Sequence, residues 1–210
     1  MKNIYHALLA MGIGLLSLTN LNAQKAKINF ASAEVGYISN NKKIKTRIFG
    51  KATLETSLGN LGFRTAQIHY GPLNWNQYYS RNILHMTDKV SGIGPMVTYL
   101  QNFGSSHIIP GFYADGFAKK LDASWASVGS DGKITDIALY LQKKIGERFS
   151  IGMETEAQIS PEKTSHYLEL EGNYKLGKVN LFYRAETISE LKKQVSTAVN
   201  HVFGVKVDLK

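Results

Sequence analysis

Residues 44–58 have the sequence IKTRIFGKATLETSL, in which two kinds of side chain alternate. One set of positions begins at Ile44 and is apolar or small, whereas the intervening set carries most of the charge and includes Lys45, Arg47 and Lys51. Successive side chains of an extended strand point to opposite faces of a sheet. The period of two therefore predicts a β-strand with one apolar and one charged face.

The same alternation recurs along most of the chain. It is clear at 149–160, at 166–176 and in the last segment, 195–209, and turn residues such as Asp131-Gly132 separate the segments. Weaker strands fit at 28–38, 62–71, 90–103, 107–118, 119–129, 134–145 and 178–189. A strand about every dozen residues, with no sustained helical period, predicts an antiparallel meander closed into a barrel, or else a sandwich.

One stretch departs from this pattern. Residues 71–89 contain several aromatic and polar side chains that do not alternate cleanly between two faces. The stretch is compatible with a long loop, a short interfacial helix or a plug folded against the inside of a barrel. We therefore count no strand there.

Composition narrows the class of protein further. The chain has 210 residues, 43% of them hydrophobic and 20% charged, with no cysteine. Ordinary apolar content argues against a disordered chain or a coiled coil. The absence of cysteine excludes disulfide scaffolds, thiolate metal sites and cysteine nucleophiles. We expect a single domain held together by packing and hydrogen bonds.

The first 23 residues have the character of a secretory signal. Lys2 precedes an apolar stretch from Ala7 to Leu18, and Ala23 offers a small residue at a cleavage site. A retained membrane anchor would need a run of about 18 apolar residues, and polar residues end this run early. We predict a signal peptide over 1–23 and a single β-barrel domain over 24–210.

Strand length bears on which face of each strand meets the solvent. Many of the expected strands have about 10–15 residues, long enough to cross a membrane when tilted. A soluble barrel buries its apolar face, whereas a membrane barrel turns that face to lipid, so alternation alone leaves both options open. Aromatic residues near expected strand ends favour the membrane barrel. The alternative is a soluble exported barrel or sandwich, periplasmic or secreted, that binds a lipid or other apolar ligand.

The signal peptide, the alternating segments from Ile44 onward, and the final strand with Phe203, Val205, Val207 and Leu209 together resemble small bacterial outer-membrane β-barrel proteins. The resemblance implies an all-β, antiparallel up-and-down barrel of about ten strands, within a range of eight to twelve. It also implies a bacterial outer-membrane location, outer-membrane lipids as partners, and a structural, adhesive or narrow-channel role.

A two-residue hairpin makes part of the charge pattern interpretable. Gly177-Lys178 suits a tight turn that pairs Leu176 with Val179. Counting back from that turn places Glu171 opposite Arg184 and Glu169 opposite Glu186. These four residues share one face of the sheet.

A second register extends the charged rows to the preceding strand. If the loop from Ser160 to Ser165 closes with that residue pair, Glu154 lies opposite Glu171 and Glu156 opposite Glu169. Carboxylates directly opposed on a sheet repel each other and require cations nearby. The sequence therefore predicts an acidic wall in need of a basic counterpart.

The basic counterpart lies in the first half of the chain. Residues 24–103 hold 10 Lys and Arg against 3 acids, whereas residues 104–210 hold 14 against 13. A ten-stranded barrel over 44–209 would place Lys45, Arg47 and Lys51 beside the last strand, near the acidic rows. Such an interior would either lock into ion pairs and plug the barrel or orient a small polar solute or ion. We favour the plug, because narrow barrels are filled by side chains.

Catalytic and cofactor motifs are weak or missing. The pairs Ser106-His107 and Ser165-His166 are sequence neighbours, which point to opposite faces of a strand and cannot act together. The histidines show no metal-ligand spacing, and phosphate loops and dinucleotide fingerprints are absent. We expect no enzyme activity, no cofactor, no metal and no nucleic-acid partner; a barrel lipase or deacylase is the third alternative.

Overall fold

A computed structural model describes residues 25–39, 43–55, 59–70, 78–102, 105–190 and 199–208, and shows twelve antiparallel strands closed into one barrel. The strands are β1 Lys25–Ile38, β2 Lys43–Glu55, β3 Asn60–Tyr70, β4 Tyr78–Thr87, β5 Ile93–Asn102, β6 Ser105–Asp115, β7 Ala123–Ser130, β8 Thr135–Ile145, β9 Phe149–Ile159, β10 Thr164–Leu176, β11 Val179–Glu190 and β12 Val199–Asp208. The predicted all-β antiparallel barrel is confirmed, with twelve strands rather than about ten. The signal peptide expected over 1–23 lies outside the described residues and stays a prediction.

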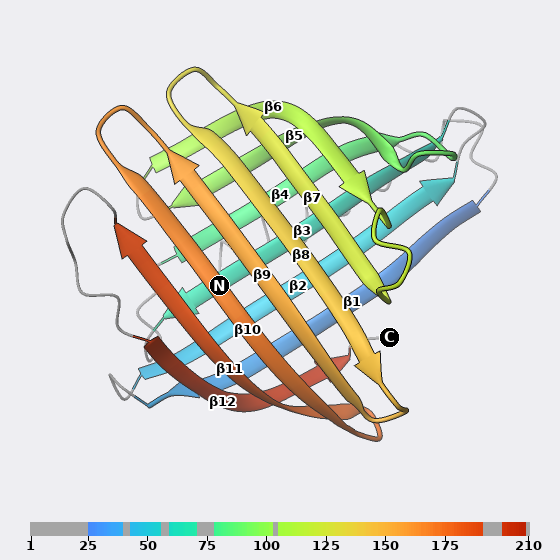
Figure 1. Cartoon of the computed structure of the whole chain (residues 1–210), viewed down its shortest axis with the longest axis vertical. Helices are drawn as coiled ribbons and strands as arrows, with labels where there is room; N and C mark the ends of the chain where they lie inside the picture. Colours follow the sequence, from blue (N-terminus) through green and yellow to red (C-terminus); the bar gives the residue numbers. More distant parts are fainter. Residues whose placement is uncertain are drawn as a thin grey trace.

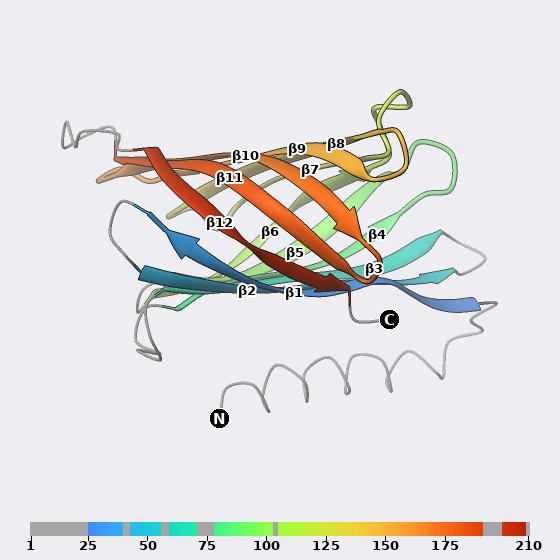
Figure 2. The same ribbon diagram turned by 90° about the horizontal axis from the view of Figure 1, so that it is seen from below.

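The connectivity is an up-and-down meander. Each strand pairs with its neighbours in sequence, and β1 pairs with β12 to close the barrel. In Figure 1, β7–β12 cross in front of β1–β6, and Figure 2 shows β8–β10 and β1–β3 as facing walls. Lys25 and Asp208 lie at the same end, here called the proximal end, and the other end is called distal. Among the described residues, no helix is long and apolar enough to cross a membrane.

Strand β1 corrects the expected closure. A barrel built from 44–209 would have placed β2 beside β12, but β1 lies between them. Glu34 pairs with Arg47 of β2 on one side and with Lys206 of β12 on the other. The segment 28–38 is therefore a full member of the barrel.

Two glycines stabilise this closing seam. Gly36 and Gly204 are directly opposed, and the ring of Phe182 packs over them together with Val202. A Cβ atom on Gly204 would lie 2.2 Å from the Val35 carbonyl oxygen and 2.7 Å from the Phe182 ring. A side chain at this position would therefore push the two strands apart.

Strand β4 is the second correction. Residues 78–87 of the stretch that did not alternate form a regular strand between β3 and β5, while 71–77 lie outside the described residues. The inner face of β4 mixes charge with Ile83, and its outer face begins with polar Ser80 and Asn82 before Leu84. Because both faces mix polar and apolar residues, the period of two was hidden.

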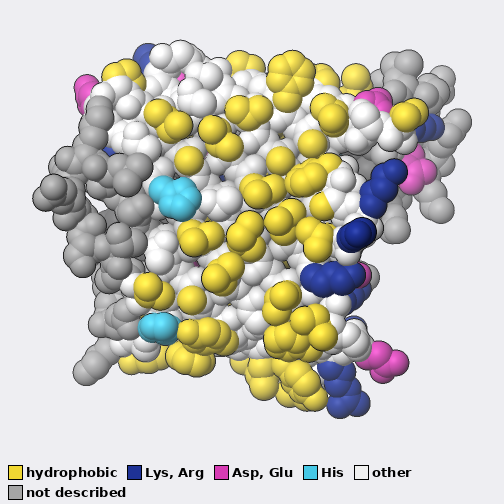
Figure 3. Space-filling model, viewed as in Figure 1, with side chains coloured by type: hydrophobic (Ala, Val, Ile, Leu, Met, Phe, Trp, Pro, Cys, Tyr) yellow, Lys and Arg dark blue, Asp and Glu magenta, His cyan; other side chains and the backbone are white. Residues whose placement is uncertain are grey.

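The outer wall of the barrel is apolar. Large hydrophobic side chains at alternate positions are exposed, among them Ile108 at 66% and Phe112 at 64%, and Figure 3 shows them spread over the visible wall. Tyr99, Phe149 and other aromatics near strand ends belong to this wall. Trp125, in contrast, lies inside the barrel and is 6% exposed.

Candidate functional site: the charged interior

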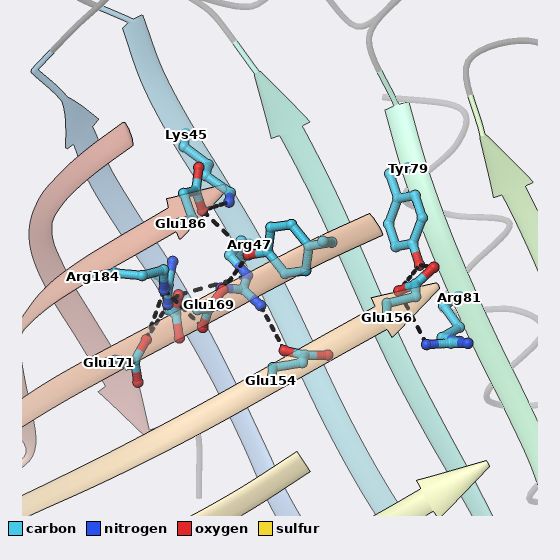
Figure 4. A network of polar contacts seen from close by, with 12 residues as sticks. Lys45, Arg47, Tyr79, Arg81, Glu154, Glu156, Glu169, Glu171, Arg184 and Glu186 are labelled. Carbon is cyan, nitrogen blue, oxygen red and sulfur yellow. Dashed lines mark hydrogen bonds and ion pairs between the residues drawn. The ribbon is translucent and has the colours of Figure 1, made fainter. Parts of the chain in front are cut away.

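Eight of the nine charged residues singled out from the sequence come together inside the barrel, from both walls (Figure 4). The nine are Lys45, Arg47 and Lys51 on β2, Glu154 and Glu156 on β9, Glu169 and Glu171 on β10, and Arg184 and Glu186 on β11. Seven of the nine charged side chains are at most 11% exposed, and eight of the nine belong to two neighbouring clusters of ion pairs. Lys51 lies apart from those eight.

The register between β10 and β11 agrees with the hairpin prediction. Leu176 pairs with Val179, and Glu171 and Glu169 lie opposite Arg184 and Glu186. Gly177 at the turn has φ +65°, in the left-handed region that a tight hairpin requires.

The register between β9 and β10 differs from the expected one by two residues. Ile159 pairs with Thr164, so Glu154 lies opposite Glu169, and Glu156 lies opposite Tyr167. The cause is the loop, in which the Ser160 amide and hydroxyl both donate to the Lys163 carbonyl oxygen at 2.8 Å. These hydrogen bonds leave Ser160 outside the ladder and close the hairpin one residue earlier on each strand.

Arg184 is the centre of the larger cluster. Its guanidinium lies 2.6 Å from Glu34 and 2.9 Å from Glu169, and it also contacts Glu171. Lys206 of β12 reaches Glu34 at 3.2 Å. The sequence argument missed Glu34, because 28–38 was left out of the ten-stranded barrel that carried the charged rows.

Arg47 connects this cluster across the barrel. Its Nη1 lies 2.6 Å from Glu169 and its Nη2 3.3 Å from Glu154, while Lys45 pairs with Glu186. Strands β2 and β9 are five positions apart around a twelve-stranded ring, so they are close to diametrically opposite. Figure 4 shows the side chains of β2 meeting those of β9, β10 and β11 between the walls.

A second cluster spans the barrel nearer its distal end. Arg81 of β4 lies 3.0 Å from Glu156 of β9 and pairs with Asp136 of β8. The Tyr79 hydroxyl donates to Glu156 at 2.6 Å, and Gln158 donates to the same carboxylate. Tyr79 and Arg81 were missed as site residues because the strand that holds them was not recognised.

The burial of these groups makes the pairing obligatory. The side chains of Lys45, Arg184 and Glu186 are at most 1% exposed. Moving an isolated charge out of water costs several kcal/mol of free energy. Removing one partner of a buried ion pair leaves the other charge with that cost uncompensated. The two clusters therefore connect strands that face each other across the interior.

The proximal part of the interior is more open. A cavity of about 690 Å³ opens there, lined by residues that include Lys51, His85 and Asp115. Lys51 pairs with Asp115 of β6 instead of with the acidic rows, and these side chains are 20% and 29% exposed. The expected place of Lys51 beside the acids was wrong, because it lies further toward the proximal end than Arg47.

Aromatic rings line one wall of this region. The His85 ring stacks on the Tyr113 ring with centroids 3.8 Å apart, and the Tyr113 ring in turn stacks on the Trp125 ring. The Arg64 guanidinium lies 4.7 Å from the Trp125 ring centroid. A Cβ atom on Gly62 would lie 2.2 Å from the His85 ring, so glycine is what allows His85 to pack against β3.

Two further histidines in the described part of the chain each contact one polar neighbour. His166 bonds Thr155 at 2.9 Å, and His107 lies 2.8 Å from Asp131 at the distal end. Within the described ranges, no group of three or more His, Asp or Glu side chains is placed to hold a metal ion.

The fold is that of a porin-like β-barrel. Two solved structures that it resembles are the NanC porin, at a TM-score of 0.59 and 11% identity, and the KdgM porin, at 0.53 and 8%. Each comparison covers 86% of this chain and 99% of the other. Neither the protein-family models nor the curated proteins give a match. The resemblance to small bacterial outer-membrane β-barrel proteins is confirmed for the fold.

Proposed function

We propose that this protein is an integral barrel of the bacterial outer membrane. In this proposal, ion pairs that cross its interior block steady ion flow. The observation that carries the closure is that Arg47 and Arg81 each contact an acid of β9, five positions away around the twelve-stranded ring. In this proposal the protein has a structural role and, in its resting state, conducts little.

The distribution of side chains supports the membrane location. The outer wall exposes apolar residues along nearly every strand, whereas the charged residues of the two ion-pair clusters lie inside. A soluble barrel has the opposite arrangement, with its apolar face inward. The porin-like fold is consistent with the same location.

Cell fractionation tests the location. The protein is expected in the membrane fraction, resistant to carbonate extraction, and with a shifted mobility on gels when the sample is not boiled. Recovery in osmotic-shock fluid would favour the soluble, ligand-binding barrel instead.

A narrow channel is the second candidate, favoured by the cavity at the proximal end. A small polar solute or ion could enter the barrel from that end and would meet the ion-paired clusters next. Steady, ion-selective currents from the wild-type protein in planar bilayers, lost in Glu156→Gln and Glu169→Gln variants, would establish this candidate and refute the closed interior. No enzyme activity is part of either proposal.

A further inference from the structure

Exposed basic residues gather at the proximal rim of β7–β11. Three connections and the strand ends beside them contribute to it, 116–122, 143–148 and 175–178, and these ranges hold seven cations and two acids, Asp122 and Glu147. The cations, here called the basic rim, are all exposed: Lys119, Lys120, Lys143, Lys144, Arg148, Lys175 and Lys178.

Among the described residues, the opposite rim of the same strands has no such excess. At the distal end, 130–135 and 159–164 hold Lys133 and Lys163 against Asp131 and Glu162, two cations to two acids. The basic rim is therefore a feature of one end of this wall and does not follow from the overall charge of the chain.

The basic rim continues directly from the apolar outer wall. Outward side chains on the same strands, at the last positions before the turns, are large and apolar: Ile145 is 51% exposed, Phe149 40%, and Leu176 49%. Figure 3 shows Lys and Arg side chains along the edge of the hydrophobic wall. A soluble polyanion would meet only the charges, whereas a lipid would meet both the charges and the apolar wall.

Internal contacts hold part of the basic rim in place. Lys143 donates to the Lys120 carbonyl oxygen at 2.9 Å, and its ammonium is 3.8 Å from Asp122. Asp122 also accepts from the Lys144 amide at 2.7 Å. These contacts join the end of β8 to the β6–β7 connection, so the cations on both are presented together.

We propose that the basic rim binds the headgroups of anionic phospholipids at this end of the barrel. The inference rests on the membrane location proposed above and adds a lipid preference to it. Long basic side chains beside a membrane-spanning segment place their charges at the headgroup level while their stems cover apolar surface. Each such charge near an anionic membrane surface strengthens binding by about five-fold at low salt.

Electron paramagnetic resonance of spin-labelled lipids measures this preference directly. The full chain is reconstituted in phosphatidylcholine vesicles, and trace spin-labelled phosphatidylglycerol or phosphatidylcholine reports the fraction of lipid immobilised on the barrel. At low salt, immobilised phosphatidylglycerol is expected to exceed phosphatidylcholine by about two-fold, averaged over all boundary lipids. At about 1 M salt, where screening acts within about 3 Å, the preference is expected to vanish.

Two matched variants separate the basic rim from general charge. Lys143→Gln, Lys144→Gln, Arg148→Gln and Lys178→Gln together are expected to abolish the preference, and Lys133→Gln with Lys163→Gln at the distal rim are expected to preserve it. Arginine at the three lysine positions should also preserve it, which distinguishes lost charge from lost folding.

Each failure has its own signature. If no immobilised lipid is seen in any sample, the membrane location fails. If lipid is immobilised without a preference, or if the distal variant loses the preference equally, the proposed role of the basic rim is overturned while the membrane location stands.

Discussion

The middle and proximal parts of the barrel interior differ in how their charges are arranged. In the middle, cations of β2 and acids of β9–β11 come from opposite walls, and their side chains meet. Near the proximal end, Lys51 and Arg64 lie directly opposite each other on adjacent strands of one wall, and a cavity of about 690 Å³ lies beside Lys51.

We interpret the difference as an effect of charge placement in addition to strand number. Twelve strands lie between the eight of barrels filled by side chains and the sixteen or more of open porins. Where long cations face long acids across the ring, the side chains span the interior. Nearer the proximal end, the Lys51–Asp115 pair stays partly exposed beside the cavity.

The largest expected effect follows from removing the centre of the network. Arg184→Met would leave Glu34, Glu169 and Glu171 buried without their main partner. We expect a loss of about 3–5 kcal/mol in the free energy of unfolding. Urea unfolding in lipid vesicles measures it, and Arg184→Lys should lose less because it keeps the charge without the planar fork. A loss below about 1 kcal/mol in Arg184→Met would contradict the role assigned to the network.

A double-mutant cycle ranks the contacts across the barrel. Arg47 lies 2.6 Å from Glu169, whose side chain is 6% exposed, and 3.3 Å from Glu154, which is 16% exposed. The coupling energy is expected to be about 2 kcal/mol for the first pair and under about 1 kcal/mol for the second. Unfolding of the single and double Arg47→Met, Glu169→Gln and Glu154→Gln variants measures both couplings. Equal couplings would show that the distance and burial of the pairs do not control their strength.

The proximal pair should matter less. Lys51 and Asp115 are partly exposed to the cavity, so water screens their attraction. Lys51→Gln is expected to cost about 0.5–1 kcal/mol in the same unfolding assay. A cost as large as that of Arg184→Met would remove the distinction between the two parts of the interior.

The smallest effect lies outside the interior, at the β7–β8 turn. The amide of Ile134 donates to the Asp131 carboxylate at 2.7 Å and, with the amide of Lys133 and His107, lowers the pKa of Asp131 to about 2. A carboxyl with a lowered pKa stabilises the fold above its unfolded pKa, near about 4, and loses that contribution as the pH falls toward 2. Asp131→Ala should therefore lower the melting temperature slightly at pH 5 and leave it unchanged near pH 2. A difference that persists at the lower pH would rule out this cause.

Some features of the fold could be predicted from the sequence and others could not. The alternation of residues 44–58 predicted a strand with two different faces, because a period of two is a local property. It left the choice between a closed barrel and a sandwich open. The hairpin at Gly177 fixed the β10–β11 register because a tight turn is also a local property. The predicted β9–β10 register was wrong by two residues because the Ser160 side chain forms a hydrogen bond across its own loop. A period of two in the sequence carries no information about such a bond.

The candidate site followed a similar rule. The acidic residues of β9–β11 and the cations of β2 were found because their faces were clear. Glu34, Tyr79 and Arg81 were missed because their strands, β1 and β4, were not counted in the barrel. Partners that meet across the interior depend on how the whole ring closes, which no single segment encodes.

Conductance in planar bilayers tests the closed interior most directly. The wild-type protein, the Arg47→Ser, Arg81→Ser double variant and an Arg64→Ser control would be compared at equal protein insertion. The double variant removes two side chains that form ion pairs across the interior, whereas Arg64 contacts the Trp125 ring and belongs to neither ion-pair cluster. We predict no steady openings for the wild-type protein and the control, and steady openings for the double variant. Steady openings of equal size in all three proteins would contradict closure by the ion-pair network.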